Sequence, residues 1–226
     1  MKKKPAIERK FTTENEDGKE LILGIIKPTQ KILQEANMKY SKSFGDGMRD
    51  GLLINREAEK IIKERNLWDE EVTEDFKNIQ NEIFEKEKFL FGIHELTDEK
   101  AIAAAHELSI LRERRWAAQR HIQSIYNNTA ESRADEMRIQ YIASQCMYNI
   151  DTNEPYYKSY NDFVDKSDTK AAGDSVYQVM IFLNGLSQNF MDELPEAKYL
   201  KAETEVVQEP KEEAKPSEEA PVVPTV

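Results

Sequence analysis

The stretch CMYNIDTNEPYYKSYNDF, residues 146–163, holds the residues of this sequence whose types and spacing come nearest to a chemical site. Asp151, Asn153 and Asp162 stand at the first, third and twelfth positions of a calcium-loop register. A calcium loop also needs a glycine at its sixth position and a glutamate at its twelfth, but Tyr156 and Asp162 stand there. The spacing therefore favours a turn, because Asp and Asn form local backbone hydrogen bonds and proline bends the chain.

Cys146 is the single cysteine of the chain. A nucleophilic cysteine needs a nearby base and an electropositive setting. Cys146 instead continues an apolar helical pattern with Met137 and Tyr141, so we expect it to be a buried, unreactive side chain. One cysteine makes no internal disulfide, which fits a reducing compartment.

No other motif predicts catalysis or metal binding. His94, His106 and His121 do not form the H-E-x-x-H pair of a zinc helix. The glycines of GDGMRDG, residues 45–51, follow a helical pattern instead of a strand and lack the lysine of a phosphate loop. We therefore expect no catalytic residue, no cofactor and no metal ion. The alternative is an enzyme whose active site is assembled from residues distant in sequence.

Two stretches are candidates for binding a partner. RERRWAAQR, residues 112–120, is the one concentrated basic patch and fits phosphates or an acidic partner, including the chain's own acidic end. IFEKEKFLFGI, residues 83–93, carries more apolar bulk than one helical face can bury. For residues 112–120, the alternative is a solvated helix face whose arginines pair with nearby Glu107 and Glu113. For residues 83–93, the alternative is a helix end that is buried on two sides. The candidate residues are Phe84, Phe89, Leu90, Phe91, Arg112, Arg115, Trp116 and Arg120.

Composition narrows the class of protein. Of 226 residues, 39% are apolar and 33% charged, and the net charge is −11. That length provides one domain of moderate size with appendages. The acidic charge argues against general nucleic-acid binding, which needs clustered Lys and Arg. The start MKKKPAIERKF lacks the apolar core of a secretory signal, and the apolar runs are too short to span a bilayer, so we expect an intracellular chain with no membrane partner.

The fold class expected from hydrophobic periodicity is mainly α, with about six helices. Residues 1–28 predict a β-hairpin packed on the helical domain, with Asp17-Gly18 as its turn. Residues 29–202 predict the helical domain. Residues 203–226 hold seven glutamates, two lysines and four prolines, which predicts a disordered Glu/Pro-rich tail. The six helices are expected near 29–51, 58–66, 69–90, 97–126, 129–146 and 168–185.

The order of features from Cys146 onward resembles that in tail assembly chaperones of tailed bacteriophages. These have a cysteine-containing helix, a D-x-G-x-P-F-like turn, a short Asp-bearing helix and an apolar helix that closes on NGL. In this sequence the turn is DTNEPY at residues 151–156, and the apolar helix ends at NGL, residues 184–186. This sequence departs from the pattern where it has Asn or Glu in place of the usual glycine, and two tyrosines in place of phenylalanine.

Two further segments resemble uncharacterised structural proteins of large marine myovirus-type phages. They are LILGIIKPTQKILQEANMKYSKSF and GLLINREAEKIIKERNLWDEE. Together with the chaperone-like order from Cys146 onward, the likeness covers residues 19–200. It implies a non-enzymatic, tail assembly chaperone-like protein in the host cytoplasm during assembly, with phage tail or other virion proteins as partners. The alternatives are a structural subunit or scaffold that stays in the virion, and a nucleic-acid-associated protein using the 112–120 arginines. Whether the chain forms a homo-oligomer is left open.

Overall fold

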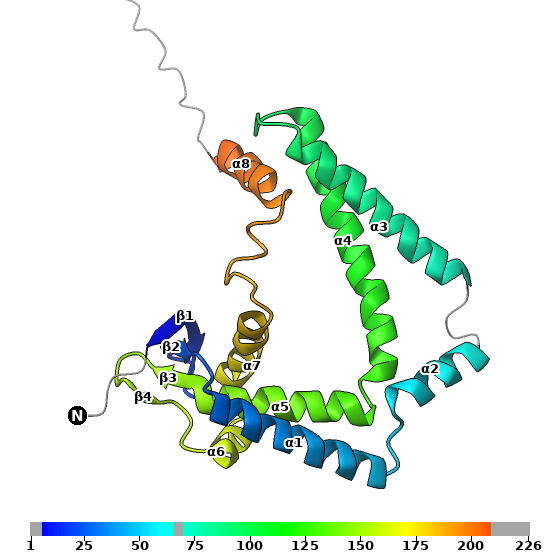
Figure 1. Ribbon diagram of the computed structural model, residues 1–226. Helices are drawn as coiled ribbons and strands as arrows, with labels where there is room; N and C mark the ends of the chain where they lie inside the picture. Colours follow the sequence, from blue (N-terminus) through cyan, green and yellow to red (C-terminus); the bar gives the residue numbers. More distant parts are fainter. Residues whose placement is uncertain (1–5, 66–69, 209–226) are drawn as a thin grey trace, which may run out of the picture.

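The computed structural model describes residues 6–65 and 70–208 (Figure 1). Over these residues the chain is mainly helical with an N-terminal β-hairpin, so the expected fold class is confirmed. The strands are β1 (Ile7–Glu14), β2 (Glu20–Ile26), β3 (Met147–Asn149) and β4 (Glu154–Pro155). The helices are α1 (Gln30–Arg49), α2 (Asn55–Glu64), α3 (Glu70–Phe91), α4 (Glu99–Tyr126), α5 (Ala130–Cys146), α6 (Tyr160–Asp165), α7 (Lys170–Leu183) and α8 (Ala197–Gln208).

The predicted hairpin forms the first half of a four-stranded antiparallel sheet in the order β1-β2-β3-β4. Its register pairs Ile7 with Ile26 and Glu14 with Glu20. Gly18 closes the turn with a φ of 73°, a conformation that glycine adopts without strain. Strand β3 then pairs with the open side of β2, so a distant segment extends the hairpin.

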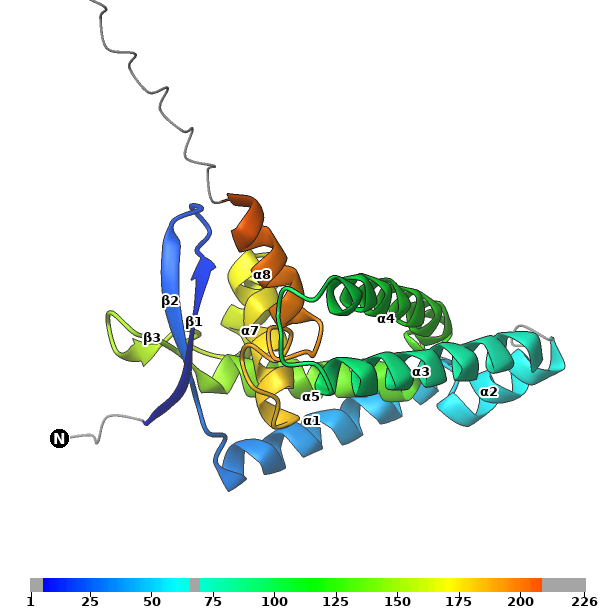
Figure 2. The same cartoon turned by 90° about the horizontal axis from the view of Figure 1, so that it is seen from above.

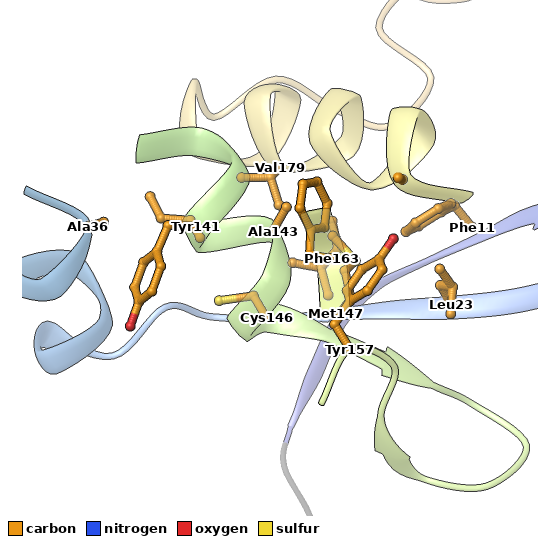
Figure 3. Packing of buried hydrophobic residues seen from close by; sticks show 13 residues of the cluster. Phe11, Leu23, Ala36, Tyr141, Ala143, Cys146, Met147, Tyr157, Phe163 and Val179 are labelled. Carbon is orange, nitrogen blue, oxygen red and sulfur yellow. The ribbon is translucent and has the colours of Figure 1, made fainter. Parts of the chain in front are cut away.

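One buried cluster joins the sheet to α1, α5, α6 and α7, and we call this part the base. Figure 3 shows Phe11 and Leu23 of the hairpin and Met147 of β3 in one cluster with Phe163 of α6 and Val179 of α7. These side chains are at most 6% exposed. Burial of this apolar area, worth about 25 cal/mol per Å², provides the main stabilisation of the base.

Helix α1 lies along α5 at close range, and a glycine makes this approach feasible. A Cβ added at Gly47 would lie 3.3 Å from Cβ of Ala130, so a larger side chain would push the helices apart. The helix passes through this glycine and ends at Arg49, just before Gly51 with its φ of 84°. Glycine therefore serves as a packing residue at one position and as a terminator at the other.

A second buried cluster joins α3, α4 and α8, and we call these three helices the arm. Figures 1 and 2 show α3 and α4 as an antiparallel pair standing away from α1, with α8 against the end of α4 nearest the 92–98 connection. The buried residues of the arm are Ile79, Ile83, Leu90, Ala101, Ala104, Ala105, Leu108, Leu111 and Tyr199. The small alanines of α4 let its partners approach closely.

The structure corrects two details of the expected organisation. Helices α6 and α8 were not among the six expected helices, although both lie in the described residues. Residues 203–208 were assigned to the disordered tail, but they form the second half of α8. Packing of Tyr199 into the arm provides the burial that composition alone did not predict. The rest of the expected tail, residues 209–226, lies outside the described residues.

Candidate partner-binding surface

Two phenylalanines of α3 lie outside the buried cluster of the arm. Phe84 and Phe91 are 60% and 69% exposed. They are seven residues apart, which places them on the same side of an α-helix. Two large aromatic rings exposed together on one helix form a surface suited to docking another polypeptide.

A third exposed phenylalanine lies on the other flank of α3. Phe89 is 44% exposed and lines a shallow hollow of about 430 Å³ between α3 and α4. Ala103 and Ala104 also line it, as do Lys86 and Glu107, which form an ion pair. The hollow therefore combines apolar and charged side chains, as protein–protein interfaces commonly do.

Leu90 does not share this exposure, which corrects its place among the candidate binding residues. It is 0% exposed and continues the buried face formed by Ile79 and Ile83. Positions four and seven residues apart share one side of a helix, so Leu90 turns inward while Phe89 and Phe91 turn outward. The apolar bulk at this end of α3 is thus divided between the core and the surface.

Arg112 is also buried, and the chain's own carboxylates occupy its guanidinium. Its Nε donates to Glu196 Oε1 at 2.5 Å and its Nη2 to Glu87 Oε1 at 2.5 Å. Burial alone lowers the pKa of Arg112, but hydrogen bonds and charge from Glu196 and then Glu87 outweigh it and raise the pKa. The expectation that Arg112 faces an external partner is therefore corrected: it links α4 to α3 and to the start of α8.

The rest of the basic patch lies further along α4. Arg114 and Arg120 are exposed, whereas Arg115 and Trp116 are half-buried. The buried Nε of Arg115 has no hydrogen-bond partner within residues 6–65 and 70–208. Arg120 lies about 12 Å along the helix from Arg112, at 1.5 Å per residue. The patch is therefore not one surface, because its first arginine is internal and the others are spread over two turns.

The 146–163 stretch serves as part of the sheet. Strands β3 and β4 form a second hairpin, and Asn153 has a φ of 56° in its turn. Asn149 Oδ1 accepts hydrogen bonds from the backbone N–H groups of Asp151 and Thr152, as expected for a turn built on side-chain amides.

Asp162 has a local structural role at the start of α6. The backbone N–H of Lys158 donates to its Oδ2 at 2.8 Å, and the Lys166 ammonium lies 3.4 Å from Oδ1. The hydrogen bond from Lys158 is the main cause that holds the pKa of Asp162 below its usual value. Its carboxylate thus secures the loop that leads into α6. Within residues 6–65 and 70–208, no three His, Cys, Asp or Glu side chains are grouped to hold a metal ion.

Cys146 is buried as expected, with an exposed fraction of 0%. Burial raises the pKa of its thiol to about 12, so the thiolate is scarce at neutral pH. We expect Cys146→Ser to lower the free energy of unfolding by about 1–3 kcal/mol, because a hydroxyl would be buried there. Urea unfolding followed by circular dichroism measures the loss, with Cys146→Ala as the control that removes the sulfur without adding a polar group. A serine variant as stable as the unaltered chain would contradict this prediction.

The described histidine side chains do not come together. His94 is exposed on the connection after α3, and His106 of α4 lies 2.7 Å from Glu203 of α8 through Nε2 and Oε2. The side chain of His121 lies outside the described set. The contact of His106 therefore helps to hold α8 against α4.

Comparison with known proteins adds no relative: no protein-family model, curated protein or solved structure matches the chain. Across residues 6–65 and 70–208, the helices do not combine the length and apolarity needed to cross a bilayer. Of the eight expected binding residues, the structure leaves Phe84, Phe89, Phe91 and Arg120 exposed, half-buries Arg115 and Trp116, and buries Leu90 and Arg112.

The sequence-based expectations missed the residues that hold α8. Tyr199 is fully buried, and Glu196 is 4% exposed beside Arg112. The available signal was the pair Tyr199 and Leu200, followed by two valines seven residues later in a helical pattern. That signal lies at the edge of a Glu-rich stretch, where composition predicts disorder.

Proposed function

We propose that this chain is a non-enzymatic assembly protein that docks another polypeptide on the outer flank of α3, in the manner of a tail assembly chaperone of tailed bacteriophages. The observation that carries the proposal is the joint exposure of Phe84 and Phe91 on one side of α3. Exposed aromatic pairs of this kind are the usual anchors of a binding interface.

Two further features support docking over catalysis. The hollow around Phe89 is open and is lined by two alanines together with glutamate and lysine side chains, a lining that suits a docked polypeptide. The net charge of −11 keeps a protein with exposed aromatic rings soluble through mutual repulsion. A chaperone needs both properties, because it presents apolar surface to one partner while remaining dispersed.

The resemblance supplies the class of partner. The turn DTNEPY and the helix end NGL follow the order found in tail assembly chaperones, so we infer that the docked polypeptide is a tail tube or tape-measure protein of the phage that encodes this chain. Binding would occur in the host cytoplasm before the tail is complete. Burying two phenylalanines contributes several kcal/mol, of the order of 2 kcal/mol for each ring.

The proposal predicts that Phe84→Ser/Phe91→Ser loses the tail partner while the chain keeps its fold. Co-expression with the tube and tape-measure proteins, followed by affinity purification and mass spectrometry, measures the retained partner. We expect at least about a tenfold loss, because anchor residues dominate interface energy. Met38→Ser is the matched control, since Met38 is 72% exposed on α1, in the base.

The outcome also separates the chaperone from a permanent subunit of the particle. A chaperone should be absent from purified virions, whereas recovery in many copies per particle would support the structural-subunit alternative. Failure of the unaltered chain to retain either tail protein, under conditions in which both are soluble, would contradict the proposal.

A further inference from the structure

Within the arm, helix α8 is held on α3 and α4 by a small set of contacts that resembles a protein–protein interface. Tyr199 is its single fully buried side chain among residues 197–204, and Leu200 packs beside it. Charged residues surround this anchor, with Glu196 before it and Glu203 after it. A central aromatic anchor with a charged rim is the arrangement found at binding hot spots.

The anchor fits a specific feature of the end of α3. The Tyr199 hydroxyl lies 3.0 Å from the carbonyl oxygen of Leu90 and 2.7 Å from that of Ile93, and its proton is shared between them. Carbonyl oxygens at a helix C-terminus lack N–H donors within the helix. The carbonyl oxygens of Leu90 and Ile93 therefore accept the phenolic hydroxyl beside the apolar side chains of α3 and α4.

The rim makes polar contacts on both sides of the anchor. Glu196 bonds Arg112 at 2.5 Å, and Glu203 lies 2.7 Å from His106. We call the surface formed by Leu90, Ile93, His106 and Arg112 the α8 groove. Its recognition pattern is Glu-x-x-Tyr-Leu-x-x-Glu on one helical face, which residues 196–203 provide.

The connection to α8 leaves the helix room to move. Residues 184–196 form no helix or strand, and their first part is fixed to β1, because Arg9 donates to the Leu186 carbonyl and Gln188 to the Lys10 carbonyl. The eight residues from 189 to 196 form hydrogen-bonded turns, and they span up to about 26 Å once these turns open. A twelve-residue helix is marginal in water by itself, so α8 depends on its groove.

We propose that the α8 groove also accepts α8 from a second copy of the chain, so that copies become linked by exchange of this helix. The occupant is argued from complementarity: the same Tyr, Leu and two Glu positions that fit the groove within one chain are present in every other copy. Because the linker is anchored on the base near Leu186 and Gln188, exchange breaks the contacts of α8 and the local turn hydrogen bonds of the linker, and it reforms the same α8 contacts between chains. This inference does not rest on the proposed docking of a tail protein.

Cysteine cross-linking between full-length chains tests the exchange. One sample carries His106→Cys and the other Glu203→Cys, and the two are mixed and treated with a short bismaleimide. Cys146 is buried with a raised thiol pKa and stays unmodified. We expect a covalent dimer that contains one chain of each kind and grows with protein concentration, as binding between copies requires.

Matched variants separate exchange from random collision. Lys201→Cys replaces Glu203→Cys as the control, because Lys201 is 60% exposed and bonds Asp192 instead of the groove. Adding Tyr199→Ala to the Glu203→Cys chain should lower the dimer yield about tenfold. The double variant His106→Cys/Glu203→Cys reports docking within one chain. The proposal would be overturned by two results together. The double variant would cross-link within one chain, and the mixture of His106→Cys and Glu203→Cys chains would give no more dimer than the Lys201→Cys control.

Discussion

Replacing Tyr199 with alanine should lower the free energy of unfolding of the arm by about 3–5 kcal/mol, the usual cost of removing a buried aromatic side chain. Tyr199 is 0% exposed and, among the α8 side chains that the structure describes (residues 197–204), is the one in the buried cluster of the arm. Its removal leaves a cavity against Leu90 and leaves two carbonyl oxygens without the hydroxyl. The loss removes the main apolar contact of α8, so the helix should be held less tightly on α3 and α4.

The measurement should distinguish the arm from the base. Hydrogen exchange followed by mass spectrometry should show faster exchange in α3, α4 and α8 of the variant, while the strand pairs of the base keep their protection. Tyr199→Phe is the matched control: it keeps the ring and removes the hydroxyl, for an expected loss of about 0.5–1.5 kcal/mol. An alanine variant that matches the phenylalanine variant would show that the ring contributes little, which would contradict the packing argument.

Separate responses are expected because the two buried clusters have different members. The base draws on the sheet and on α1, α5, α6 and α7, whereas the arm draws on α3, α4 and α8. Three segments connect them: the one that contains α2, residues 127–129 between α4 and α5, and residues 184–196. Two cores of this kind unfold as one transition only if the contacts between them are strong, so a change at Tyr199 should remain in the arm.

Local signals were enough to predict the hairpin and the long helices. Asp17-Gly18 between apolar strands predicts the β1–β2 turn, and this pairing is present. Thr29, Asp98 and Thr129 cap α1, α4 and α5 through their side-chain oxygens, as N-cap residues do. These features depend on neighbours in sequence, which is why periodicity and turn signals predicted the elements that contain them.

Features that depend on distant partners were not predictable in the same way. Strand β3 is three residues long and exists because β2 offers it an unpaired side. Arg112 and Glu196 are 84 residues apart, so no spacing rule connects them. In α3, the burial of Leu90 follows from the stripe through Ile79 and Ile83, and that stripe also decides which phenylalanines remain exposed.

The second large effect is expected at the buried ion pair between Arg112 and Glu196. Their side chains are 9% and 6% exposed, and Arg112 also bonds Glu87. Arg112→Met should lower the free energy of unfolding of the arm by about 3–5 kcal/mol, because it leaves a buried carboxylate without its cation. Urea unfolding and hydrogen exchange of the arm measure the loss, as for Tyr199.

A double-mutant cycle shows whether the pair or the packing is responsible. Arg112→Met/Glu196→Gln removes both charges, so its loss should be smaller than the sum of the single losses by about 0.5–3 kcal/mol, the usual coupling of residues in contact. The exposed pair His106 and Glu203 in the same interface is the matched control, and Glu203→Gln should cost about 0–1 kcal/mol. Additive losses at Arg112 and Glu196 would contradict the coupling. They would also mean that this arginine contributes through its methylene chain, so that α8 is positioned by its aromatic anchor alone.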